Sequence, residues 1–371
     1  MTKKAKLIYF FVGTTAELIK LSPVIRELKK RKLGFKIIAT NQNKLHFDNL
    51  IPIIGKCKAD YTFIMKPYSW PNNIYLRFVI WILKSFGNYL IYFKNEFSEG
   101  RGQNSYFIVH GDTITALIGA FVAKVCHVKL VHIESGLRSF NFLEPFPEEL
   151  CRFMISWLAD IHFSPNKWAV GNLKRKKGIK VNTFNNTVSE SVNTALQTKS
   201  SRKITGLRGQ KYFIFVVHRQ EHTLFNKKSS KGLIEHVIGK ANENLKCVFI
   251  MHKLTVDYLV NQKLYAKINR NKNVVMPSRL PYIKFIKLLS SAEFIATDGG
   301  SNQEEAYYLG TPCLILRNCT ERIEGLNENA VLAGNDINMI DKFIEQYKVY
   351  KRKHVVVKKK PSKIIVDSLL H

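Results

Sequence analysis

Short runs of apolar, strand-forming residues alternate along this chain with segments that have helical spacing. In the first half, the runs at 6–13, 35–40, 106–111 and 129–134 are typical of strands, and helical segments such as 17–31 separate them. A β-α-β alternation of this kind favours a parallel, doubly wound sheet with helices on both faces. The alternation therefore predicts an α/β fold.

The same alternation restarts after a polar stretch around residues 165–210, which predicts a second sheet. Its expected strands lie at 212–219, 246–252, 273–277, 293–300 and 312–318. A chain of 371 residues is long enough for two domains. We expect an N-terminal Rossmann-like domain at 1–170, a C-terminal Rossmann-like domain at 171–345 and a basic tail at 346–371.

The chain is strongly basic, with 58 Lys and Arg against 28 Asp and Glu and a formal net charge of +30. Such a charge favours phosphorylated ligands, polyanions or anionic membrane surfaces without choosing among them. The nearly apolar segment 74–93 is interrupted by Arg77 and Lys84. We expect it to be a helix packed on a sheet, and a helix that touches a membrane interface is the alternative.

Motif spacing excludes several common sites. The chain has neither a G-x-G-x-x-G nor a P-loop pattern, which argues against an ordinary dinucleotide or P-loop site. Its six cysteines show no C-x-x-C spacing, as expected of reduced thiols in a cytoplasmic protein.

Polar residues recur where the predicted strands end. Asp112 and Glu134 follow apolar runs in the first half, and His218, His252 and Asp298 follow runs in the second. A charge at the end of a buried strand is unfavourable unless it has a partner or a ligand. Because ligands of open α/β sheets bind beyond the carboxyl ends of the strands, these residues predict a site at that edge.

The segment 298–312 predicts a phosphate-binding turn. Small residues open it, and a helix expected to start near Asn302 would direct its positive end at an anion. Glu305 would lie in the first turn of that helix, and Arg317 and Arg322 follow the next strand. Together these features predict a nucleotide-diphosphate site in the second half.

A series of motifs in this order resembles the UDP-N-acetylglucosamine 2-epimerases, in particular the non-hydrolysing bacterial type. The motifs are GTTAELIKLSPVI (13–25), VHGDTITAL (109–117), HIESGLR (132–138), PFPEELCR (145–152), HFSPNKWAVGNL (162–173), NNTVSESV (185–192), HRQEHT (218–223) and TDGGSNQEEAYYLGTPCLILRNCTERIE (297–324). The resemblance implies a GT-B-like pair of Rossmann-like domains with the active site between them. It also implies a cytoplasmic homodimer that needs no cofactor and no metal.

The resemblance also implies roles for individual residues. The implied catalytic residues are Asp112, Glu134, Glu148 and His218. The implied ligands of the UDP-sugar are Lys20, Arg152, Arg219, His252, Phe285, Gly299, Gly300, Ser301, Glu305 and Arg322.

The implied reaction inverts C2 of the sugar by eliminating UDP to a 2-acetamidoglucal and adding it back. Moving a proton off one face of the ring and onto the other needs two groups, which suits paired carboxylates. Cations and a helix N-terminus would stabilise the charge on the departing diphosphate. The product would be a UDP-ManNAc-type sugar for surface polysaccharide synthesis.

Departures from the family pattern, in the loops at 41–43 and 65–69 and at three single positions, keep other functions open. Thr15 stands where the family has an arginine, Leu254 replaces an asparagine, and Gly299 replaces a serine. One alternative is a membrane-surface glycosyltransferase that uses a UDP-sugar and a lipid-linked acceptor. The other is a catalytically weakened UDP-sugar-binding partner in a polysaccharide assembly complex.

Overall fold

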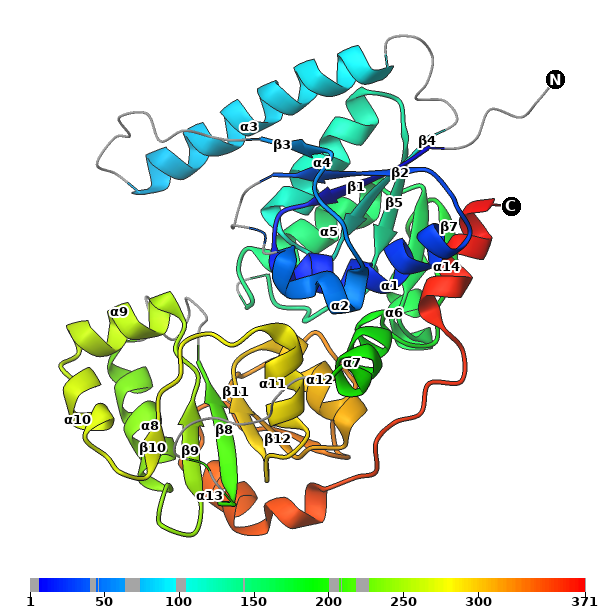
Figure 1. Ribbon diagram of the computed structural model, residues 1–371. Helices are drawn as coiled ribbons and strands as arrows, with labels where there is room; N and C mark the ends of the chain where they lie inside the picture. The colour runs from blue at the N-terminus through cyan, green and yellow to red at the C-terminus, as the bar shows by residue number, and fades with distance from the viewer. Residues whose placement is uncertain are drawn as a thin grey trace. The chain divides into compact units, whose positions relative to one another are not determined.

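The chain forms two α/β units, each built on its own parallel sheet (Figure 1). The structure is a computed structural model that describes residues 7–40, 45, 47–63, 74–97, 105–142, 144–199, 207, 209–217 and 227–370. The first unit comprises residues 1–191 and 358–371, and the second comprises residues 192–357. The predicted pair of Rossmann-like domains is confirmed.

The first unit contains a seven-stranded sheet with the order β3-β2-β1-β4-β5-β6-β7. Every neighbouring pair of its strands is parallel. The strands are β1 (Leu7–Val12), β2 (Phe35–Ala39), β3 (Tyr61–Thr62), β4 (Ser105–His110), β5 (Lys129–Ile133), β6 (Ile161–Ser164) and β7 (Ile179–Asn182). The helices are α1 (Thr15–Lys30), α2 (Ile51–Ile54), α3 (Ile74–Phe97), α4 (Ile114–Val125), α5 (Glu148–Leu158), α6 (Lys167–Asn172) and, from the end of the chain, α14 (Pro361–Leu370). The helix α7 (Val188–Gln197) begins in the first unit and continues into the second.

Alternating aromatic residues attach α3 to the sheet of the first unit. Tyr9 and Phe11 point to the same face of β1 and contact Phe93 of α3 edge-on or tilted. Phe107 on β4 meets the same phenylalanine at a ring-centroid distance of 5.0 Å. The apolar segment 74–93 therefore forms a helix packed on a sheet, as predicted. In the described part of the chain, no helix has the length and apolarity needed to cross a membrane.

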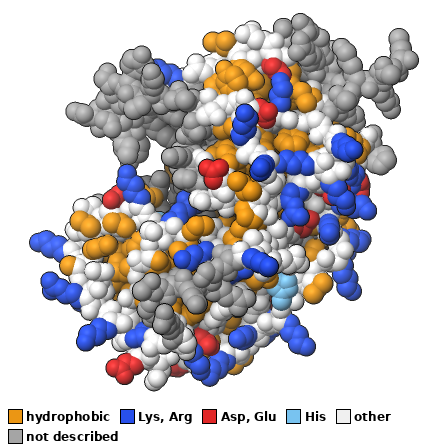
Figure 2. Space-filling model, in the orientation of Figure 1, with side chains coloured by type: hydrophobic (Ala, Val, Ile, Leu, Met, Phe, Trp, Pro, Cys, Tyr) orange, Lys and Arg blue, Asp and Glu red, His pale blue; other side chains and the backbone are white. Residues whose placement is uncertain are grey.

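Basic side chains are spread over the surface that Figure 2 presents, with few acidic ones among them. The net charge of +30 is therefore not confined to the end of the chain. A distribution of this kind raises the local concentration of anionic ligands around the protein.

The second unit contains a six-stranded sheet with the order β10-β9-β8-β11-β12-β13, again parallel throughout. The strands are β8 (Tyr212–Val216), β9 (Lys246–Phe249), β10 (Val274–Val275), β11 (Ile295–Thr297), β12 (Cys313–Ile315) and β13 (Ala330–Leu332). The helices are α8 (Lys227–Gly239), α9 (Lys253–Asn261), α10 (Tyr265–Asn269), α11 (Tyr282–Leu289), α12 (Gly300–Leu309) and α13 (Ile337–Gln346).

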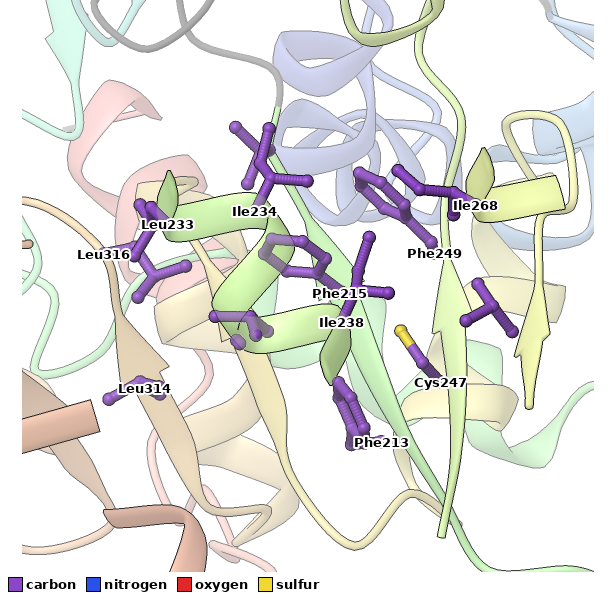
Figure 3. Close-up of a cluster of buried hydrophobic side chains, with 14 of the residues drawn as sticks. Phe213, Phe215, Leu233, Ile234, Ile238, Cys247, Phe249, Ile268, Leu314 and Leu316 are labelled. Carbon is purple, nitrogen blue, oxygen red and sulfur yellow. The ribbon is translucent and has the colours of Figure 1, made fainter. Parts of the chain in front are cut away.

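Figure 3 shows how one face of this second sheet is covered. Phe215 of β8 and Phe249 of β9 stack with ring centroids 4.6 Å apart. Ile234 and Ile238 of α8 lie over them, one helical turn apart. All of these side chains are buried, so the packing rigidly connects α8 to the strands that carry the loops of the candidate site.

Two predicted boundaries are wrong. The first domain does not end at 170, because β7 pairs with β6 and extends the first sheet. The segment 346–371 is not a tail, because α14 packs beside α1 in the first unit (Figure 1). Arg31 of α1 binds Asp367 of α14 at 2.6 Å, and Ile365 is completely buried.

Each sheet has one point where the strand order reverses. In the first unit this point lies between β1 and β4, and in the second it lies between β8 and β11. Loops leave in opposite directions there, which opens a crevice at the carboxyl edge of a doubly wound sheet. The candidate residues of each unit follow these strands and their neighbours.

Candidate functional site

Asp112 lies in the turn between β4 and α4. Gly111 allows this turn with a φ of +66°, and Thr113 caps α4 by accepting the backbone N–H of Ala116. Asp112 keeps 22% of its side chain exposed, while its Oδ2 accepts a hydrogen bond from Nη2 of the buried Arg152. The expected ligand Arg152 thus pairs with an expected catalytic acid within one unit.

Glu134 follows β5 and is almost completely buried. Its carboxylate accepts two hydrogen bonds from Lys20 Nζ, at 2.6 and 3.0 Å, and one from Asn186 Nδ2 at 3.0 Å. His110 Nε2 lies 3.3 Å from the same carboxylate. Glu134 also has a φ of +67°, an uncommon conformation for a residue other than glycine. Lys20, expected to bind the substrate, therefore holds Glu134.

Glu148 begins α5 one helical turn before Arg152, the residue that pairs with Asp112. Burial raises the pKa of Cys151 to about 12, and the negative charges of Asp112 and Glu148 act in the same direction. The structure therefore brings two of the expected acids around one side chain. Glu134 lies at the same edge of the sheet, since β4 and β5 are neighbours.

Glu149 is the central acid of this region, and the motifs did not single it out. It is fully buried and accepts a hydrogen bond from Arg152 Nη1 at 2.8 Å. The backbone N–H of Ser139 donates to the same oxygen, Oε2, at 3.1 Å, and the other oxygen, Oε1, pairs with Arg138. Glu149 therefore fixes both Arg152 and the loop that precedes α5. The sequence feature that could have identified Glu149 is its position directly after Glu148 in the P-E-E motif.

Glu17 connects the loop after β1 to the loop after β4. It accepts backbone hydrogen bonds from Gly13 at 2.6 Å and Thr14 at 3.1 Å, and a side-chain bond from Thr113 at 2.6 Å. Burial raises the pKa of Glu17 to about 7, opposed by these hydrogen bonds and assisted by the charge of Asp112. The two loops at the switch point of the first sheet are thus coupled.

In the second unit, α12 begins directly after β11, so its N-terminus lies at the carboxyl edge of the sheet. Gly299 is the N-cap and Gly300 the first helical residue. The expected start near Asn302 is therefore wrong by two residues, and Glu305 lies in the second turn rather than the first. The glycine pair explains the difference, because helices often begin at a small N-cap. The backbone N–H groups at this end are suited to an anion.

Arg322 packs directly against this helix start. Its Nη1 lies 2.7 Å from Glu304 Oε2, and its Nε lies 3.5 Å from Glu321 Oε1. Arg317 pairs with the same Glu321 at 2.9 Å. A Cβ on Gly300 would lie 2.6 Å from Glu321 Oε1, so the close approach requires glycine. Two arginines are thus held at the positive end of a helix.

The other expected ligands of the second unit lie on its carboxyl edge or beside it. Glu305 is 5% exposed on α12, and Ser301 precedes it in the first turn. His252 is the N-cap residue of α9, and Phe285 on α11 packs against the core. His218 and Arg219 lie outside the described residues.

Each unit therefore contributes a distinct chemistry. The first holds carboxylates paired with Lys20 and Arg152, an arrangement suited to moving a proton at a substrate carbon. The second holds a helix N-terminus with Arg317 and Arg322 nearby, an arrangement suited to a diphosphate.

Comparisons with known proteins agree with this geometry. The sequence profile of a family described as UDP-N-acetylglucosamine 2-epimerase matches residues 82–363. The UDP-N-acetylglucosamine 2-epimerase of Methanococcus maripaludis is 32% identical over 358 residues, covering 90% of each chain. The enzyme of that name from Bacillus subtilis is 30% identical over 349 residues, covering 93% of this chain and 87% of its own.

Solved structures extend the likeness to the fold. The UDP-GlcNAc 2-epimerase of Neisseria meningitidis, bound to UDP-GlcNAc, is 28% identical with a TM-score of 0.77 and covers 99% of this chain and 100% of its own. The Methanocaldococcus jannaschii enzyme, in complex with UDP-GlcNAc and UDP, is 28% identical with a TM-score of 0.78 and covers 98% and 99%. These matches favour the epimerase over the glycosyltransferase alternative. The chain belongs to the UDP-N-acetylglucosamine 2-epimerase family.

Proposed function

We propose that this protein is an isomerase that inverts C2 of UDP-GlcNAc or a related UDP-HexNAc. The observation that supports it best is the group of acids at the carboxyl edge of the first sheet. Asp112 and Glu134 each have a cationic partner, and Glu148 lies one helical turn from Arg152, the partner of Asp112. The relatives that share this fold are named for the same reaction on UDP-GlcNAc.

The proposed reaction runs by elimination and re-addition. A base removes the C2 proton, the electron pair of the C–H bond forms the C1–C2 double bond, and the C1–O bond breaks with its electrons leaving on UDP. The intermediates are 2-acetamidoglucal and UDP. UDP then attacks C1 again while an acid delivers a proton to the opposite face of C2, so that atoms and charges balance.

We assign the proton transfers and the positioning of the sugar to Asp112, Glu134 and Glu148. Two carboxylates on opposite faces are the minimum for inversion through a planar carbon. Lys20 and Arg152 compensate the negative charge of the buried acids, which would otherwise be unfavourable. His218 is proposed to assist the departing phosphate.

UDP binding is assigned to the second unit. The N-terminus of α12 at Gly299 and Gly300 would receive the diphosphate, with Arg322 as its cationic neighbour. Glu305 would accept hydrogen bonds from the ribose, and Phe285 would pack on the uracil. Ser301, His252 and Arg219 are proposed to complete the contacts with the nucleotide.

Proton exchange at C2 tests this proposal directly. The full-length protein is incubated with UDP-GlcNAc in D₂O, and C2 is followed by NMR. Deuterium at C2 together with UDP-ManNAc is the expected result. Free ManNAc and UDP would instead mean a hydrolysing enzyme. An absence of exchange at C2, with transfer of sugar to a lipid-linked acceptor, would overturn the epimerase and favour the glycosyltransferase.

The product is proposed to supply a UDP-ManNAc-type sugar for surface polysaccharide synthesis in the cytoplasm. We also propose that the protein is a homodimer, which sedimentation velocity would test by a mass of twice the 42.8 kDa chain.

A peripheral contact with an anionic membrane is a further part of the proposal. Leu83 and Ile91 of α3 are exposed, with Lys84 and Lys94 beside them on the same helix. Co-sedimentation with phosphatidylglycerol vesicles, and none with phosphatidylcholine vesicles, is expected. Equal binding to both or to neither would contradict it.

A further inference from the structure

Asn302 lies in the first turn of α12, and its side-chain amide contacts the Glu305 carboxylate. Nδ2 of Asn302 donates a hydrogen bond to Glu305 Oε2 at 3.0 Å. Oδ1 of Asn302 accepts one from the hydroxyl of Thr297 at 3.1 Å. The backbone N–H of Gly299 donates in turn to that hydroxyl at 2.9 Å. Four residues, from the end of β11 to the second turn of α12, thus form a continuous chain of hydrogen bonds.

This chain of hydrogen bonds has a single direction. An ionised carboxylate can only accept, so the amide nitrogen of Asn302 donates to Glu305. Asn302 Oδ1 then faces the Thr297 hydroxyl and accepts its proton, while that hydroxyl accepts from the backbone N–H of Gly299. An aspartate at position 302 would have no proton to donate at neutral pH and would place a second negative charge beside Glu305.

The surroundings of Glu305 are suited to a ligand that carries hydroxyl groups. The Tyr282 hydroxyl is buried and, among the residues that the structure describes, has no hydrogen-bond partner. Burial, together with the charges of Glu305 and Glu304, raises the pKa of Tyr282 well above its ordinary value. The phenol therefore stays protonated, and a buried polar group of this kind is unfavourable until it finds a partner.

We propose that Asn302 is a positioning residue that orients the Glu305 carboxylate toward the ribose hydroxyls of the uridine nucleotide. Asn302 acts through Glu305 and need not touch the ligand. The inference rests on the proposed function and deepens it, since it names the residue that sets the preference for ribose over 2′-deoxyribose. A carboxylate discriminates between the two sugars best when a fixed partner holds its orientation.

Isothermal titration calorimetry of the full-length protein with UDP and with 2′-deoxy-UDP tests this role. The wild type is expected to prefer UDP by about tenfold or more, the effect of one hydrogen bond to a charged group. Asn302→Asp should weaken UDP binding by about tenfold and remove most of the preference. Asn338→Asp is the matched control, because Asn338 is exposed in the first turn of α13, and it should change neither value.

A second variant covers the case in which Asn302→Asp does not fold. Thr297→Val keeps the shape of a fully buried side chain and removes the hydroxyl that fixes the amide, so it should also lower the preference for UDP. If the wild type prefers UDP and both variants, folded by circular dichroism, keep that preference, the positioning role is wrong. Equal binding of UDP and 2′-deoxy-UDP by the wild type would also overturn the positioning role, but it would leave the proposed UDP site standing. A wild type that binds neither ligand would overturn the proposed function itself.

Discussion

Glu134 has an unfavourable backbone conformation and a buried carboxylate, and hydrogen bonds from Lys20 and Asn186 stabilise it. Its φ of +67° is uncommon outside glycine and asparagine, and residues held in such conformations cluster at active sites. Lys20 binds its carboxylate from α1, and Asn186 binds it from the loop between β7 and α7. The position of this acid therefore depends on side chains remote in sequence, which no local pattern around residue 134 reveals.

Replacing this acid should separate catalysis from nucleotide binding. Glu134→Gln is expected to reduce C2 proton exchange by about 100-fold or more, because a neutral amide cannot transfer the proton. It also removes the negative charge that the buried Lys20 ammonium contacts, which should destabilise the protein by about 3–5 kcal/mol. Exchange is followed by NMR and stability by urea unfolding, while the affinity for UDP should stay unchanged.

A surface pair provides the control for that variant. Lys267 binds Glu235 at 2.8 Å with 73% of the lysine side chain exposed. Glu235→Gln should change stability by no more than about 1 kcal/mol, because water solvates the remaining charge. A Glu134→Gln variant that kept full C2 exchange would contradict the role assigned to Glu134.

Glu17 should make stability depend on pH. Its pKa is about 7 in the folded protein against 4.5 as the ordinary value, so the folded state holds this proton more tightly. The free energy of unfolding should therefore fall as pH rises from about 4.5 to 7, by about 3 kcal/mol at most. Urea unfolding at pH 5 and pH 8 measures this. Glu17→Gln should lose the pH-dependent part, and an equal decline in both proteins would rule Glu17 out.

The residues most accessible to sequence reasoning were those that follow apolar runs. Asp112, Glu134 and Gly299 stand at strand ends, and the structure places them at the carboxyl edges of the sheets. Glu149 and Asn186 escaped prediction because their importance comes from partners that only the folded chain brings near. Lys20 and Arg152 were expected to bind substrate, and their contacts with acids likewise appear only in three dimensions.

At the scale of elements, the start of α12 depends on the absence of a side chain. Gly300→Ala would place a Cβ 2.6 Å from Glu321 Oε1 and 2.9 Å from Arg322 Nε. The resulting shift should destabilise the second unit by about 1–3 kcal/mol and weaken UDP binding. Thermal unfolding and calorimetry measure the two effects.

The matched control is a glycine in open surroundings. A Cβ on Gly232 of α8 would meet nothing within 4 Å, and α8 is regular helix there. Gly232→Ala should therefore stabilise the protein by about 0.4–1 kcal/mol, because alanine restricts the unfolded chain. Destabilisation by both alanines would show that space at Gly300 is not what matters.

Elements with a continuous apolar run were predicted within a few residues. The strands β1, β4 and β5 are examples, because burial on both faces leaves a strong signal. The strand β7 was missed, since its sequence IKVN has one exposed end and no apolar run. Its place in the sheet is fixed by pairing with β6, a tertiary effect that outweighs local composition.

At the scale of the whole molecule, the last helix is a structural part of the first unit. Ile365, Val366 and Leu369 are buried, and Glu190 accepts hydrogen bonds from Ser362 at 2.7 and 2.8 Å. Deleting residues 358–371 should lower the melting temperature by several degrees or more, because each buried aliphatic side chain contributes roughly 1.5–3 kcal/mol.

The contrasting variant removes charge and keeps the helix. Replacing Lys358, Lys359 and Lys360 by glutamine leaves the buried face of α14 intact, so the melting temperature should hardly change. If truncation had as little effect as these substitutions, the segment would behave as the basic tail that its sequence predicted.

Because α14 belongs to the first unit, the two units complete their folding in a defined order during protein synthesis. Residues 192–357 form the second unit from one continuous stretch, so that unit can fold as soon as the stretch has left the ribosome. The first unit begins translation earlier, yet it is completed only when residues 358–371 emerge and α14 docks on α1. On a nascent chain, the sheet that carries the acids therefore reaches its full stability after the second unit can fold.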